Sequence, residues 1–218
     1  MITIDSRGPR RAFRLRTLTI AMVALIVANV NMAPALADTG GSPMAVTQTM
    51  VDHALQIMAN KKAPIQQRRR QLREAIENEF DFTEMSRSAL GYHWRTLSQN
   101  QRSQFTQLFT AFIEDAYLSK IQDYSDQQVQ FQGQSPLGQG YTQINTAIVE
   151  PGKSPIAVNY LLLQKDTTWK IYDVTVDAIS IIANYRNQFN RVINEKGFDQ
   201  LMADLQAKQQ ELASLLGN

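Results

Sequence analysis

The spacing of apolar residues changes twice along this chain, and that change limits the folds open to it. Residues 44–124 repeat apolar side chains at intervals of three and four, the mark of helices with one apolar face. Residues 129–176 alternate with period two between glycine and proline turns, which is typical of strands. Helical spacing returns over residues 178–216. Helices on both sides of a single run of strands predict an α+β fold.

Capping residues mark the ends of several predicted helices. Asp81 or Thr83 is suited to begin a short helix that Gly91 ends, and Ser98 is suited to begin the next one. Gly197 separates the last two helices. The predicted helices cover residues 44–60, 65–80, 81–91, 99–124, 178–197 and 199–216.

The period-two region predicts about four strands. Short Gly/Pro connections leave no room for crossover helices, so the strands should pair as an antiparallel meander. Both faces of the third strand are apolar, which predicts cover on both sides. The predicted strands lie near residues 129–131, 141–150, 156–165 and 168–176.

The first 37 residues have the layout of a secretory signal peptide. Five arginines precede the apolar run 18–30, which is shorter than the roughly 20 residues that cross a bilayer. The run leads to Ala35-Leu36-Ala37, a pattern that signal peptidase cleaves. We therefore expect cleavage after Ala37, a flexible segment 38–43 and a single domain 44–218; a retained anchor is the alternative. The arginines are Arg7, Arg10, Arg11, Arg14 and Arg16.

Composition excludes several classes of function for the mature chain. Residues 1–37 hold five of the 22 basic and one of the 20 acidic residues, so 17 basic and 19 acidic residues remain, a net charge of −2. This balance does not favour a nucleic-acid partner. The chain has no cysteine, which excludes disulfides and thiolate metal sites. No second apolar run approaches 18 residues, so we expect a soluble mature protein.

The sequence offers no catalytic or metal-binding motif. It has two histidines, His53 and His93, and neither occurs in a metal-ligand spacing or beside a nucleophile motif. No cofactor is expected. The run Arg68 to Arg70 suggests either contact with lipid headgroups or a partner, or an exposed turn of helix. Acids interleave with arginines over residues 68–87, which predicts a solvated, salt-bridged surface.

Apolar and aromatic residues are more numerous than a small sheet requires. Spacing alone is satisfied by an ordinary core, and a ligand cavity is the alternative. These residues are Phe80, Phe82, Phe105, Phe109, Phe112, Tyr117, Val174, Val176, Ile179, Ile181 and Tyr185.

Two blocks of sequence resemble a known family. The first is FDFTEMSRSALGYHW, residues 80–94, followed by QRSQFTQLFTAFI. The second is WKIYDVTVDAISIIANYRNQF, residues 169–189, followed by Gly197-Phe198-Asp199. In order, spacing and position both resemble the MlaC family, also called the toluene-tolerance auxiliary proteins. A related branch is associated with hopanoids, but the NYRNQF block is more similar to MlaC proper.

The resemblance implies a periplasmic phospholipid carrier without enzymatic activity. Such a carrier shuttles lipid between an outer-membrane lipoprotein complex and an inner-membrane ABC transporter with MCE-domain rings, and a monomer suits that role. The expected architecture is an NTF2-like cup of helices over a small antiparallel sheet, with an added helical subdomain. The lipid tails would contact Phe82, Phe105, Phe109, Phe112, Tyr117, Val174, Val176, Ile181 and Tyr185.

Two departures from the family pattern bear on partner contacts and headgroup preference. Tyr160 is followed by Leu161 where many relatives carry arginine, and Gln99 replaces a proline before the long helix. Two other functions remain open at this point. An enzyme would use His93 with a carboxylate such as Asp173, and a chaperone or adaptor would bind unfolded outer-membrane proteins.

Overall fold

The computed structural model describes residues 41–118 and 127–217. The predicted signal peptide 1–37, the first residues of the segment 38–43 and the end of the helix predicted over 99–124 lie outside the described residues. The described elements are α1 (Pro43–Ala59), α2 (Ile65–Glu79), α3 (Phe82–Leu90), the 3-10 helix η1 (Gly91–Thr96), α4 (Gln99–Leu118), β1 (Gln128–Gly138), β2 (Tyr141–Val149), β3 (Ile156–Lys165), β4 (Thr168–Val176), β5 (Ile179–Ser180), α5 (Ile181–Lys196) and α6 (Phe198–Leu216).

The strands form one antiparallel sheet in the order β1-β2-β3-β4-β5, so each strand pairs with its neighbour in sequence. This meander confirms the predicted α+β class. The described sheet has five strands rather than about four, because residues 179–180 add the short strand β5 to the end of β4.

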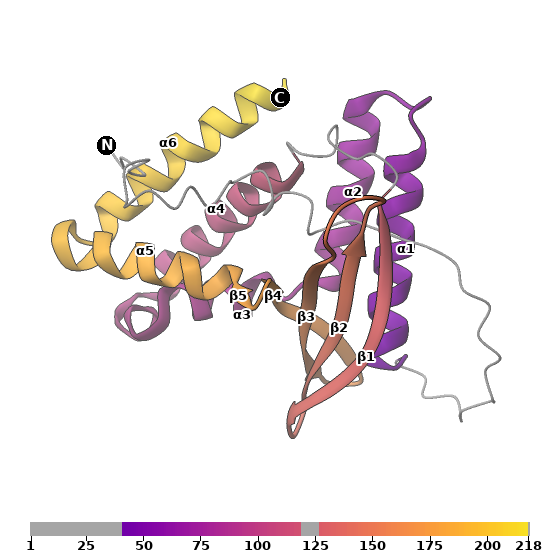
Figure 1. The fold of residues 1–218 in the computed structure, drawn as a ribbon. Coiled ribbons are helices and arrows are strands. Elements are labelled where there is room, and N and C mark those ends of the chain that lie inside the picture. The colour runs from indigo at the N-terminus through magenta and orange to yellow at the C-terminus, as the bar shows by residue number, and fades with distance from the viewer. Residues whose placement is uncertain (1–40, 119–126, 218) are drawn as a thin grey trace.

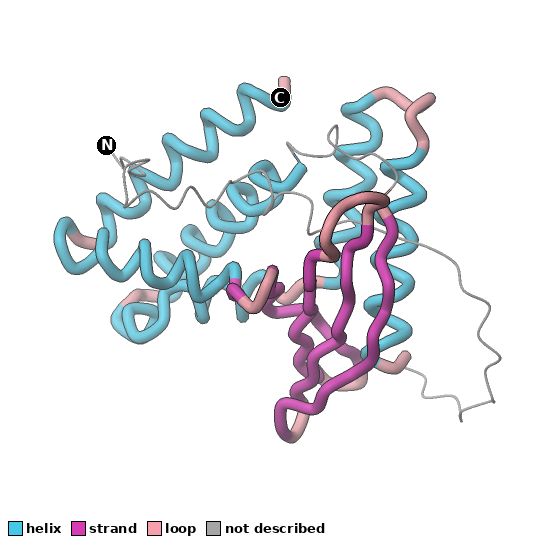
Figure 2. Tube along the Cα trace, in the orientation of Figure 1, coloured by secondary structure: helices cyan, strands magenta, loops and turns pink. Residues whose placement is uncertain are grey.

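The helices form two groups around the sheet (Figure 1). Helices α1 and α2 pack together and lie against one face of the sheet, while α3 to α6 gather beside β4 and β5. Figure 2 shows the same separation of the cyan helices on either side of the magenta strands. The sheet therefore contacts both groups of helices.

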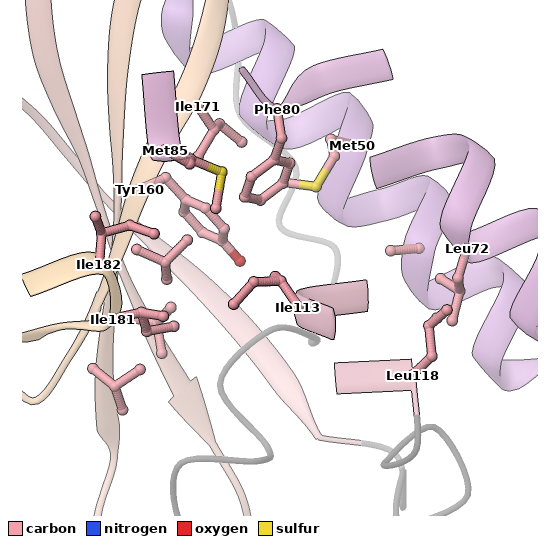
Figure 3. Packing of buried hydrophobic residues seen from close by; sticks show 14 of the residues in the cluster. Met50, Leu72, Phe80, Met85, Ile113, Leu118, Tyr160, Ile171, Ile181 and Ile182 are labelled. Atoms are coloured by element: carbon pink, nitrogen blue, oxygen red, sulfur yellow. The ribbon is translucent and has the colours of Figure 1, made fainter. Parts of the chain in front are cut away.

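The core lies where the sheet meets both groups of helices. Figure 3 shows Tyr160 and Ile171 of the sheet beside Phe80, Met85 of α3 and Ile113 of α4. Tyr160, Ile171 and Ile113 are at most 2% exposed. The outer face of β3 is half-buried, with alternate residues partly exposed, so the predicted cover on both faces of this strand is wrong.

Local capping explains where the helices begin and end. Asp81 accepts a hydrogen bond from the Glu84 N–H at 3.0 Å and begins α3, which Gly91 ends at φ 57°. Ser98 accepts from the Gln101 N–H at 3.2 Å, and the Gln101 side chain accepts from the Ser98 N–H at 2.9 Å. This reciprocal pair is a capping box at the start of α4. The predicted roles of Asp81, Gly91 and Ser98 are confirmed.

Two element boundaries differ from the sequence expectation. Strand β1 continues through Gly133 and Pro136, which remain paired with β2, and β-bulges shift the register between Phe131 and Gly133 and between Pro136 and Gly138. Helix α5 begins at Ile181 and not at Ala178. Ala178 adopts φ 64° in the turn between β4 and β5, a conformation that a helix excludes.

Within residues 41–118 and 127–217, no helix combines the length and apolar character needed to cross a membrane.

Candidate functional site

An aromatic cluster fills the space between α4, α5 and α6. Phe105 and Phe109 of α4 are fully buried, and their rings stack with centroids 5.4 Å apart. Phe189 of α5 meets both rings edge-on, at 5.9 and 5.6 Å. Tyr185 meets Phe109 at 5.7 Å and Phe112 at 5.5 Å, again edge-on. The predicted residues Phe105, Phe109, Phe112 and Tyr185 therefore belong to one aromatic wall.

A second apolar wall comes from the inner face of the sheet. Val174 and Val176 of β4 are each 2% exposed and lie opposite Tyr160 and Val158 of β3. Ile181, the first residue of α5, is buried beside them in the same core cluster. The two walls belong to one continuous cluster of buried side chains.

Phe82 and Tyr117 lie at the margins of that cluster. Phe82 is half-buried and stacks on Phe80 with centroids 5.9 Å apart. Tyr117 is half-buried in the last turn of α4. Burial raises the pKa of its phenol, and the charges of Tyr185 and Asp173 raise that pKa further. All nine predicted residues thus belong to the cluster or pack against it, whereas Ile179 is 44% exposed.

Three tyrosine hydroxyls enter this apolar interior without hydrogen-bond partners among the described residues. They belong to Tyr117 of α4, Tyr160 of β3 and Tyr185 of α5. Tyr160 is only 1% exposed, and burial raises its pKa. Burial also raises the pKa of Tyr185, to about 12. Because these hydroxyls make no hydrogen bond with the described residues, they can pair with a polar part of a ligand.

Sequence reasoning omitted Tyr160 and Phe189 from the site. The period-two position of Tyr160 between Val158 and Leu162 could have placed it on the inner face of the sheet. Phe189 follows Tyr185 by one helical turn and therefore shares its face.

Asp173 and His93 are not joined as an acid–base pair in the described structure. The Asp173 carboxylate accepts hydrogen bonds from the Ser180 hydroxyl, from the N–H of Val174 in β4 and from the N–H of Ile182 at the start of α5. Burial raises the pKa of Asp173, against the effect of these donors. His93 is buried beside the Tyr92 ring, and burial lowers its pKa. No group of three potential metal ligands occurs within the described ranges.

The arginine-rich face of α2 differs from the predicted solvated surface. Arg69 is 9% exposed and donates from Nη1 to the Leu216 carbonyl oxygen at 2.7 Å. Arg73 binds Glu114 at 3.0 Å and Asp115 at 2.7 Å, both buried on α4. These partners lie between 41 and 147 positions away from the arginines in the sequence, so helical spacing alone does not reveal them.

The chain is thus an α+β protein in which helices pack against an antiparallel meander sheet and enclose a buried aromatic cluster. The model of the family described as MlaC protein matches residues 48–207, and the chain belongs to this family. The intermembrane phospholipid transport system binding protein MlaC of Haemophilus influenzae is 24% identical over 197 residues, which cover 87% of this chain and 89% of that protein.

A solved structure has the same fold. The phospholipid-binding protein from Ralstonia solanacearum, in complex with a phospholipid, superposes with a TM-score of 0.71 at 21% identity. The match covers 79% of this chain and 99% of that one. The predicted family and fold class are therefore confirmed.

Proposed function

We propose that this protein is a periplasmic phospholipid carrier without enzymatic activity. It would hold acyl chains in the apolar interior between the sheet and helices α3 to α6. It would move lipid between an outer-membrane lipoprotein complex and an inner-membrane MCE-domain ABC transporter, as a monomer exported by residues 1–37. The MlaC membership and the names of the two relatives support this proposal.

The observation that carries the proposal is a large apolar cluster that includes three tyrosines whose hydroxyls make no hydrogen bond with the described residues. Each methylene transferred from water to an apolar interior gains about 0.8 kcal/mol, so two acyl chains bind strongly without specific contacts. Tyr160, with Tyr117 and Tyr185, offers hydrogen-bond donors to the ester oxygens that join the tails to glycerol. Apolar walls with a few polar groups are typical of ligand sites.

The proposed tail contacts are the nine residues predicted from the sequence. The aromatic side chains pack against one another, so acyl chains that lie between them require these rings to separate. A partner that favours the separated arrangement would promote loading or release.

Native mass spectrometry tests the proposal directly. The chain from Asp38 to Asn218 is purified from a bacterial envelope without detergent, and bound material is extracted into organic solvent. We expect about one phospholipid per chain. A chain that is repeatedly lipid-free and takes up none from vesicles contradicts the carrier function, and copurifying peptide would indicate a chaperone instead.

A pair of neighbouring substitutions localises the lipid. Val174→Glu places a carboxylate on the inner face of β4, while Thr175→Glu places one on the opposite face. We expect Val174→Glu to lose the lipid and Thr175→Glu to retain it, with circular dichroism confirming that both variants fold. His93→Ala should also retain lipid and transfer, whereas loss of transfer there would favour an enzyme.

A further inference from the structure

A separate pocket of about 250 Å³ lies where α2 faces the ends of α4 and α6. Its α2 side is formed by residues 66, 69, 70 and 73, which share one face of the helix. Leu118 and Leu216 close it from the C-terminal ends of α4 and α6. Three of the six lining residues are arginines, so the pocket is strongly cationic.

Arg69 is held in place within this pocket. Its Nη1 donates to the Leu216 carbonyl oxygen at 2.7 Å, and Gln66 Nε2 donates to the same oxygen at 2.6 Å. That carbonyl is at the C-terminal end of α6, where the helix dipole favours a cation. The Arg69 Nε is nevertheless buried and has no hydrogen-bond partner within residues 41–118 and 127–217. The side chain is 9% exposed and retains an unused donor beside the cavity.

The other two arginines leave further donors. Arg70 is exposed and makes no ion pair or hydrogen bond with the described residues. Arg73 commits Nε to Glu114 and Nη2 to Asp115, which leaves Nη1. Burial and Glu77 raise the pKa of Glu114 to about 7, against Arg73, so its negative charge is incomplete near neutral pH. Cationic donors therefore exceed the acceptors around the pocket.

We propose that this pocket binds a phosphate group, either free or as part of a lipid headgroup. A tetrahedral phosphate accepts several hydrogen bonds at once, and guanidinium groups match its oxygen geometry. Arg69, whose buried Nε is unused, and the exposed guanidinium of Arg70 provide donors from the α2 side of the cavity. The site is distinct from the apolar interior, so it goes beyond the tail binding proposed above.

Nitrogen-15 NMR titration of the chain from Asp38 to Asn218 tests the site at constant ionic strength. Sodium phosphate, glycerophosphoglycerol and sodium chloride are added in separate series. We expect saturable shifts of the amides of residues 66–73 and 216 with the two phosphate compounds, and none with chloride. Tighter binding of glycerophosphoglycerol than of phosphate assigns the site to a lipid headgroup, and the reverse order assigns it to free phosphate.

Arg70→Gln and Arg191→Gln form a matched pair, because both arginines are exposed on helices and only Arg70 lines the pocket. Loss of one charged hydrogen bond at a partly exposed site should weaken phosphate binding about fivefold in Arg70→Gln. Arg191→Gln should bind like the unmodified chain. Equal dissociation constants in the two variants, or no saturable shift at all, would overturn the proposal. Native mass spectrometry of lipid occupancy is independent of this result.

Discussion

Asp173 on β4 accepts a hydrogen bond from the backbone N–H of Ile182 at 3.1 Å, which ties the sheet to the first turn of α5. The same carboxylate accepts from the Val174 N–H and from the Ser180 hydroxyl. Asp173 thus satisfies one free N–H group at the start of α5, that of Ile182, from a different element, while Ser180 caps the helix locally.

Asp173→Ala should destabilise the protein, because it leaves buried donors at Val174 and Ile182 without an acceptor. We expect the free energy of unfolding in urea to fall by about 2–4 kcal/mol. Glu195→Ala, an exposed change on the same helix, should alter it by less than about 0.5 kcal/mol. Equal effects of the two changes would contradict the role of Asp173.

Glu114 should make stability depend on pH. Its pKa is raised from 4.5 to about 7 in the folded protein, mainly by burial, so the folded state retains a proton that the unfolded chain releases. The contribution of this group to stability is therefore complete below about pH 4.5 and is lost as the pH rises to about 7. Urea unfolding of the unmodified chain and of Glu114→Gln between pH 4.5 and 8 measures this contribution. The difference between them should grow in favour of the glutamine variant as pH rises, and a difference that stays constant would contradict the prediction.

The substitution Tyr160→Phe tests whether the Tyr160 hydroxyl acts in lipid binding and not in the stability of the fold. The hydroxyl makes no hydrogen bond with the described residues, so its removal should change the free energy of unfolding of the protein by less than about 1 kcal/mol. The same change should reduce lipid occupancy in native mass spectra, if the hydroxyl binds an ester oxygen as proposed. Tyr172→Phe changes a half-buried tyrosine of the adjacent strand and should affect neither quantity. A destabilised Tyr160→Phe variant would indicate that the hydroxyl has a protein partner.

Asp81 should contribute stability that acid removes. Burial opposes ionisation of this carboxyl, but Lys165 at 2.7 Å and the Glu84 N–H lower its pKa below the usual value. This stability is present above about pH 4 and is lost as the pH falls through the folded pKa. Asp81→Asn should therefore be destabilised at pH 7 and should approach the unmodified chain near pH 3. A difference that stays constant from pH 7 to pH 3 in urea unfolding would contradict this.

Local signals explain why the helices could be predicted. Capping at Asp81, Gly91 and Ser98 depends on residues within one turn, so the pattern is readable in sequence. The bulges of β1 could not be predicted in the same way. Gly133 and Pro136 are turn formers in isolation, and only the register of β2 reveals that the strand continues past them.

Part of the candidate site could also be predicted from the sequence. Apolar spacing predicted that Phe105, Phe109 and Val174 would be buried, and the structure confirms their burial. Spacing could not reveal that the Tyr160 hydroxyl lacks a partner, because that depends on every element around it. It also could not reveal that Arg73 pairs with α4, since Glu114 is 41 residues away.

The meander order of the sheet also sets a sequence of events during synthesis. Strands β1 to β4 pair with immediate neighbours, and hairpins of this kind form within about 1–10 μs. The contacts that hold α3 and the residues before it in place are remote: Phe80 bridges Ile171 of β4, Asp81 binds Lys165 of β3 84 positions later, and Ser88 binds Arg186 of α5 98 positions later. Helix α3 therefore leaves the ribosome long before its partners exist. Its contacts with β4 and α5 must wait until those elements have been made, and the apolar surface that they cover stays exposed until then, which favours binding of the nascent N-terminal half by a chaperone.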